Sequence, residues 1–143
     1  MRRITTIACV VALAAILASL AYASSVRHFK GPVKGGGRIA LSAERQQGHF
    51  FLAGLFSVKR VPVTCDEGDT KYSHAPTENA VHIKHRRFHY DFATGTAVAR
   101  ITGRFNRRFS KARGKFRVAD VDVDKSFTNC TTSDSRRWTA HKR

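Results

Sequence analysis

Positively charged side chains crowd into residues 104–117, and their density favours binding of phosphate or carboxylate groups. This stretch holds seven Arg or Lys residues, with Phe105 and Phe109 between them, and Arg100 extends the charge upstream. We expect Phe105 to lie in the core and Phe109 to be exposed in a turn. The predicted anion-binding residues are Arg100, Arg104, Arg107, Arg108, Lys111, Arg113, Lys115 and Arg117. The alternative is a surface whose charge serves only solvation.

The whole chain is strongly basic, with 26 Lys and Arg against 10 Asp and Glu, and its net charge is +16. Such an excess attracts polyanions. Outside a cell, the expected partner is an anionic polymer: teichoic acid, acidic polysaccharide, an anionic lipid surface or extracellular nucleic acid. The chain has no RNP, KH or zinc-finger pattern, so we expect no base-specific recognition.

Three histidines, His82, His85 and His89, have a spacing that would suit metal ligands on one helix face. Their segment alternates like a strand, however, which points His82 away from the other two. Lys and Arg residues between them add positive charge, which opposes a divalent cation. We therefore expect no metal site here.

Asp120, Asp122 and Asp124 are similar to the oxygen ligands of calcium loops. The chain lacks the glycine and the distal glutamate of an EF-hand at this place, and Val121 and Val123 alternate with the aspartates. The pattern predicts an amphipathic strand whose carboxylates lie beside basic strands. We expect no bound metal and no cofactor.

No motif for nucleophilic or metal-assisted catalysis is present, because the chain has neither a G-x-S-x-G nor an H-E-x-x-H sequence. Serines, histidines and aspartates are numerous enough for chance pairs. We expect a non-enzymatic protein, and the alternative is a small secreted hydrolase with an unrecognised site.

The basic residues are carried by the clearest structural pattern in the chain, a pair of strands over Val98–Val123. Small or apolar residues alternate with polar ones in residues 97–105, which is typical of a strand with one buried face. A basic turn is expected at Asn106–Arg113. Gly114 then opens the second strand, and a bulge is expected near Ala119–Asp120.

Similar patterns predict further strands on both sides of this pair. One covers residues 39–43, and a longer one covers 49–63 with a bulge at Lys59–Arg60. Residues 66–79 are rich in small polar side chains and predict a loop. A strand follows at 81–92, with Phe92 facing inward, then a loop at 125–135 and a short last strand at 136–140.

These elements predict an all-β fold, an antiparallel β-sandwich or barrel of about six to eight strands with one disulfide. No segment shows a sustained helical period. The residues expected to face inward are Phe50, Phe56, Phe88, Tyr90, Ile101, Phe105, Phe116, Val118 and Trp138.

The first 23 residues have the three parts of a secretory signal peptide. Arg2 and Arg3 precede an apolar run at Ile7–Leu20, and Ala21-Tyr22-Ala23 is a small-x-small cleavage site. The apolar run is short for a membrane span. We therefore expect a signal peptide at 1–23, a flexible basic lead-in at 24–37, a single β domain at 38–143 and no integral membrane span. The exported protein is expected to be a secreted or envelope monomer.

The expected mature chain contains two cysteines, Cys65 and Cys130. Exported proteins meet an oxidising environment, in which such a pair forms a disulfide. The sequence therefore predicts a Cys65–Cys130 bond.

Several short motifs resemble those of a group of small secreted β-domain proteins of actinobacteria. They are Cys65-Asp66-Glu67-Gly68, Gly103-Arg104-Phe105, Ala112-x-Gly114, Cys130 and Trp138-x-Ala140. The resemblance covers most of Ile39–Arg143 and implies export and a β fold. The group has no assigned activity, so the resemblance implies no catalytic residue. This chain has Ser133-Asp134-Ser135 where the group usually has a glycine.

Overall fold

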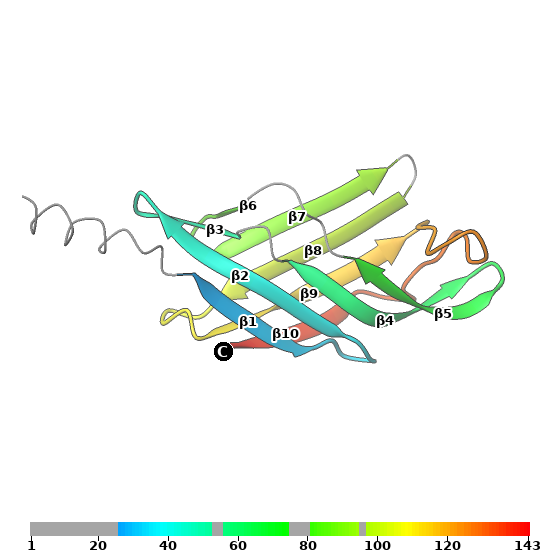
Figure 1. The fold of residues 1–143 in the computed structure, drawn as a ribbon, viewed down its shortest axis with the longest axis horizontal. Coiled ribbons are helices and arrows are strands. Elements are labelled where there is room, and N and C mark those ends of the chain that lie inside the picture. The colour runs from blue at the N-terminus through cyan, green and yellow to red at the C-terminus, as the bar shows by residue number, and fades with distance from the viewer. Residues whose placement is uncertain (1–25, 53–55, 75–80, 95–96) are drawn as a thin grey trace, which may run out of the picture.

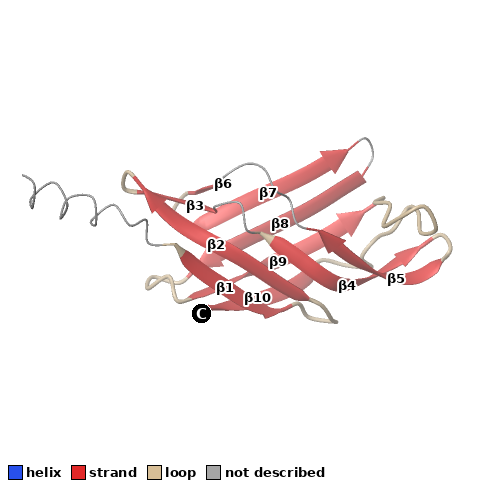
Figure 2. Ribbon diagram, viewed as in Figure 1, coloured by secondary structure: helices blue, strands red, loops and turns tan. Residues whose placement is uncertain are grey.

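The computed structural model describes residues 26–52, 56–74, 81–94 and 97–143. The expected signal peptide lies outside these residues, and so does the side chain of Phe92. The described residues form β-strands and no helix, as Figure 2 shows. Within this part of the chain no helix has the length and hydropathy needed to cross a membrane.

The chain forms an antiparallel sheet, in agreement with the predicted all-β class. The strands are β1 (Arg27–Pro32), β2 (Arg38–Gln46), β3 (His49–Leu52), β4 (Ser57–Cys65), β5 (Gly68–His74), β6 (Val81–Ile83), β7 (Arg87–Thr94), β8 (Ala97–Phe105), β9 (Lys111–Ala119) and β10 (Arg136–Lys142). Their order in the sheet is β5-β4-β2-β1-β10-β9-β8-β7. The expected single strand over residues 49–63 is instead two strands, β3 and β4. Both pair with β2, at different parts of it, but β3 also pairs with β6 and β4 with β5.

The sheet curls into a half-barrel, and its concave side holds the core. Figure 1 shows β2 and β4 crossing in front of β8 and β9, so that the two halves of the sheet face each other. At one end β3 pairs with both β2 and β6, and β6 turns directly into β7. The expected inward residues all belong to this core; six are buried, and Phe50, Phe56 and Tyr90 pack against it partly exposed.

The predicted central pair is confirmed as the β8–β9 hairpin, in which Ile101 lies opposite Phe116. The turn is shorter than expected, because Lys111 already begins β9. Asn106 holds this turn together: its side-chain oxygen accepts hydrogen bonds from the backbone N–H groups of Ser110 and Lys111 at 2.9 and 3.2 Å. Gly114 therefore lies inside the strand instead of opening it.

Residues 27–32 are not a flexible lead-in, and this expectation is wrong. They form β1, an interior strand that pairs with β2 on one side and β10 on the other. Phe29 is completely buried. The segment shows only one large apolar side chain, so its strand pattern is too weak to be recognised without the two neighbouring strands.

The bulge predicted at Lys59–Arg60 is confirmed. The register between β4 and β5 shifts between Val58 and Val61, and Arg60 has a φ of 57°. This extra residue brings Val61, Val63 and Cys65 onto the buried face.

The prediction of a loop over residues 66–79 is wrong for its first half, because Gly68–His74 forms β5. β5 ends the order of strands and buries only one large side chain, that of Tyr72. An edge strand of this kind needs little apolar surface, which explains why its composition resembled that of a loop.

The disulfide between Cys65 and Cys130 is confirmed. It ties the segment after β9 to the β4–β5 turn, and two hydrogen bonds between Thr64 and Thr131 accompany it. The amphipathic strand expected at Asp120–Asp124 is not formed. β9 ends at Ala119, and Asp120 takes a φ of 53°.

Aromatic rings fill the core towards the β8–β9 turn. Phe105 lies edge-on to Phe29 at 5.0 Å between ring centroids and stacks on Phe109 at 5.0 Å. Phe109 in turn stacks on Phe50 at 4.2 Å. The expectation that Phe109 is exposed is therefore wrong: a φ of 49° turns its ring back over the core, where it is 8% exposed.

Tyr72 is buried, and its burial predicts a response to alkaline pH. Burial, aided by the charge of Tyr90, raises the pKa of Tyr72 to about 12. The unfolded chain ionises this phenol near pH 10, so folding stability should be unaffected below pH 10 and should fall as the pH rises from 10 to 12.

We expect the Tyr72 phenol to account for about 1 kcal/mol of lost stability at pH 11. Denaturant unfolding at pH 8 and pH 11 measures this loss, and Tyr72→Phe should reduce it by that amount. An equal loss in the variant and the wild type would show that Tyr72 is not the group concerned.

Candidate anion-binding site

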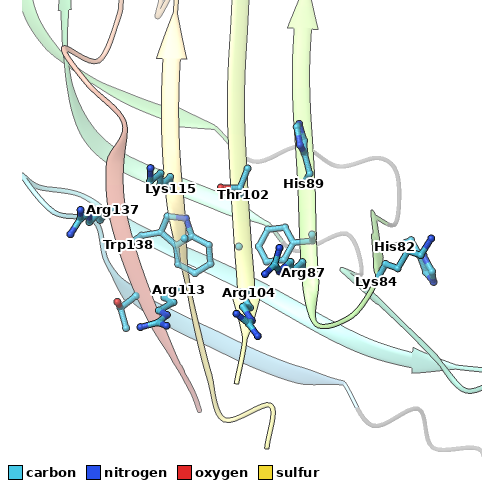
Figure 3. A pocket seen from close by; sticks show the side chains of 14 residues that line it. His82, Lys84, Arg87, His89, Thr102, Arg104, Arg113, Lys115, Arg137 and Trp138 are labelled. Carbon is cyan, nitrogen blue, oxygen red and sulfur yellow. The ribbon is translucent and has the colours of Figure 1, made fainter. Parts of the chain in front are cut away.

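A groove of about 970 Å³ crosses the outer, convex face of β7, β8, β9 and β10. Six cationic side chains line it (Figure 3). They are Lys84, Arg87, Arg104, Arg113, Lys115 and Arg137. We call this surface the basic groove.

The first wall of the basic groove is a row of three arginines on three neighbouring strands. Arg87 of β7 lies directly opposite Arg104 of β8, which lies directly opposite Arg113 of β9. Thr139 of β10 continues the row. All three arginines are exposed. We call these three residues the arginine row; Figure 3 shows them side by side.

The second wall lies two residues further along each strand. His89 is opposite Thr102, and Thr102 is opposite Lys115, which in turn lies opposite Arg137. Two cations, Lys115 and Arg137, are therefore direct neighbours here as well.

The floor between the two walls follows from the alternation of the strands. Phe88, Gly103, Gly114 and Trp138 form the row between them, and their side-chain positions face the core. A Cβ on Gly103 would come within 2.3 Å of the Phe88 ring and 2.8 Å of the Trp138 ring. The two rings thus pack closely under the glycines, and the outer side of this row presents backbone.

Asp91 partly neutralises the outward-facing row beyond the second wall, whereas the arginine row has no such ion pair among the described residues. Asp91 accepts hydrogen bonds from Arg100 Nε and Nη2 at 2.8 and 3.0 Å, and His89 Nε2 lies 2.8 Å from Asp91 Oδ2. The Arg100 hydrogen bonds hold the pKa of Asp91 below its usual value, with a smaller contribution from His89. The same contact raises the pKa of Arg100. Among the described residues, no ion pair involves a member of the arginine row.

Most of the other acidic side chains in the described residues lie at the opposite end of the molecule, around the disulfide. Figure 1 places the 120–135 segment and the β4–β5 turn at one end of the sheet and the β8–β9 turn at the opposite end. There the carboxylates bind backbone and hydroxyl groups: Glu67 accepts hydrogen bonds from Thr128 N and Oγ1 at 2.8 and 2.6 Å. These two bonds lower the pKa of Glu67.

The structure brings three of the eight predicted anion-binding residues into the basic groove: Arg104, Arg113 and Lys115. The other five lie elsewhere on the surface. Arg100 and Arg117 face each other in the row that Asp91 partly neutralises, Arg107 and Arg108 are exposed in the β8–β9 turn, and Lys111 lies opposite His141.

Sequence reasoning missed Lys84, Arg87 and Arg137, which line the same groove. A signal for two of them was present, because Arg87 and Arg137 each precede a residue that was expected to face inward. A residue next to an inward one on a strand faces outward. What the pattern could not supply was that these strands flank β8 and β9.

The three histidines considered as metal ligands do not converge. The ring centroid of His82 lies 5.1 Å from that of Phe51 and 5.7 Å from that of His49. His85 lies in the β6–β7 turn, and His89 is paired with Asp91. No group of three or more potential metal ligands is found in the described part of the chain.

Comparisons of the chain with protein-family models, curated proteins and solved structures find no match. The resemblance to secreted actinobacterial β-domain proteins therefore stays a prediction.

Proposed function

We propose that this protein is secreted and binds an anionic polymer through the basic groove, without catalysing a reaction. The observation that carries the proposal is the arginine row: three exposed guanidinium groups on directly opposite positions of three strands, with no ion-pair partner among the described residues. The disulfide supports the secreted location, because such bonds persist mainly in oxidising compartments.

Like charges directly opposite each other on a sheet destabilise it. A protein whose only need was solubility could interleave the two signs of charge, as it does where Asp91 meets Arg100. A bound polyanion removes the repulsion, since each anionic group can lie between neighbouring arginines. The arrangement is thus unfavourable in the free protein and favourable in a complex.

Affinity of this kind comes from several weak contacts. One exposed ion pair contributes only about 0–1 kcal/mol, so the six cations of the basic groove must act together. On a linear polyanion each contact releases condensed counterions, which makes binding fall steeply as salt rises.

We expect a triple variant of the arginine row, Arg87→Gln, Arg104→Gln and Arg113→Gln, to bind heparin about tenfold to a hundredfold more weakly at low salt. The slope of log affinity against log salt should become shallower by about two to three units. Titrations at several salt concentrations measure both quantities.

The control is a triple variant that removes the same charge from exposed positions elsewhere: Lys34→Gln, Lys71→Gln and Lys125→Gln. A second variant, Arg107→Gln, Arg108→Gln and Lys111→Gln, tests the predicted turn residues. If all three variants lose the same affinity, net charge explains the binding and the basic groove is not a site.

A specific contact also keeps the hydrolase alternative open. His28 Nδ1 lies 2.8 Å from Ser42 Oγ, at a second outer groove on β1, β2 and β4. Against this reading, Ser42 is only 2% exposed, and no carboxylate hydrogen bond to His28 is found among the described residues. Turnover of ester, glycoside or phosphate substrates that Ser42→Ala abolishes would support the alternative.

A further inference from the structure

We infer that the basic groove selects its ligand by charge spacing and by the shape of the anion, and that it prefers closely spaced phosphate groups to carboxylates. This inference rests on the proposed function and names the ligand class of the same site.

The first argument is the spacing of the cations. Directly opposite side chains on neighbouring strands have Cβ atoms about 5 Å apart, and the two walls are separated by about 7 Å along the strands. Arg87, Arg104, Arg113, Lys115 and Arg137 therefore share a patch about 15 Å across. Some polymers have charges that are further apart than the width of this patch. Such a polymer neutralises one cation and leaves the neighbouring cations repelling each other. A chain with several charges inside the patch neutralises all of them.

The second argument is the geometry of the acceptor. The two coplanar oxygens of a carboxylate match the fork of one arginine. Asp91 shows this on the row beyond the second wall, where its two oxygens bind Arg100 and one of them also lies 2.8 Å from His89 Nε2. A phosphate group has oxygens that diverge tetrahedrally, so it can accept hydrogen bonds from two neighbouring arginines at once. The arginine row offers such pairs twice, Arg87 with Arg104 and Arg104 with Arg113.

The third argument is that the cations sit on a rigid support. β8 and β9 lie inside the sheet and are paired on both edges. The Phe88 and Trp138 rings pack against the glycines beneath the groove floor. The bases of Arg104 and Arg113 are therefore held at fixed spacing, and pairing with Arg104 places Arg87 beside them. A site with fixed spacing can discriminate between polymers.

The experiment compares inorganic polyphosphate, single-stranded DNA, polyglutamate and hyaluronate, each at the same ionic strength and at matched numbers of charges. Wild-type protein should bind polyphosphate at least tenfold more tightly than polyglutamate, and hyaluronate most weakly. The key variant is Arg87→Lys, Arg104→Lys and Arg113→Lys, which keeps the charge but removes the forks. It should lose most of the preference for polyphosphate while its affinity for polyglutamate changes little.

The outcomes separate the two proposals. Equal affinity of wild-type protein for polyphosphate and polyglutamate, or an unchanged preference in the lysine variant, overturns the inference while the groove can still be the binding site. If the glutamine variant of the arginine row binds every polymer as tightly as the Lys34, Lys71 and Lys125 control, the proposed function itself fails. Single-stranded DNA distinguishes the source of the phosphate: binding as tight as that of polyphosphate supports phosphodiesters as equal ligands, and weaker binding supports condensed phosphate.

Discussion

Replacing Cys65 and Cys130 together by alanine is expected to lower the free energy of unfolding by about 4 kcal/mol. The bond closes a loop of 65 residues, and a cross-link of that span restricts the unfolded chain by roughly this amount in the chain-entropy model. Cys130 is also fully buried, and its segment contacts the β4–β5 turn through hydrogen bonds such as Asn129 Nδ2 to Asp66 Oδ2 at 2.6 Å. Urea unfolding of the variant and the wild type measures the difference.

Wild-type protein unfolded in the presence of a thiol reductant serves as the control, because reduction removes the same bond without changing a side chain. Both preparations should lose a similar amount of stability. A loss below about 1 kcal/mol in both would mean that the hydrogen bonds around the disulfide already hold this end of the sheet, and it would contradict the expected role of the bond.

Gly114→Ala is expected to lower the free energy of unfolding by about 3 kcal/mol or more and can prevent folding altogether. A Cβ on Gly114 would overlap the backbone carbonyl oxygen of Thr102 and come within 2.7 Å of the Trp138 ring. Neither the Thr102 carbonyl nor the Trp138 ring can move away easily, because Thr102 belongs to an interior strand and Trp138 is buried. Trp138 is the only tryptophan in the chain, so its fluorescence reports the local disturbance directly.

Gly48→Ala is the matched control for this substitution. Gly48 has a φ of 84°, but a Cβ there would have no neighbour within 4 Å. Its replacement should cost only the backbone strain of about 1–2 kcal/mol. If Gly114→Ala and Gly48→Ala lower the stability equally, the close approach of Trp138 to the sheet is not what requires glycine at position 114.

The removal of the arginine row has a second consequence for stability. Because like charges oppose each other there, the glutamine variant should be as stable as the wild type or slightly more stable at low salt, while it binds polyanions less well. A site kept for binding at the expense of stability is expected to behave in this way.

Local sequence features determined the fold class and several details within the strands. Alternation in residues 97–105 identified a strand and its buried face, since side chains of a strand point to opposite sides at every second residue. The change of phase after Lys59 and Arg60 located a bulge, because one inserted residue must reverse that alternation. The pairing of Cys65 with Cys130 followed from there being two cysteines in the expected mature chain.

Only the tertiary structure decided which strands are neighbours. Alternation states which face a residue occupies but carries no information about the strand that lies beside it. Arg87 precedes Arg104 by 17 residues in the sequence, and Arg137 follows Arg113 by 24. The strand order β10-β9-β8-β7 nevertheless places all four arginines on one groove. Conversely, Arg107 and Arg108 are close to Arg104 in sequence, but the turn places them at the end of the hairpin, away from the arginine row. The interior position of β1 could not be predicted for the same reason. β1 lies inside the sheet because β2 and β10 pair with it, and its own composition does not show this.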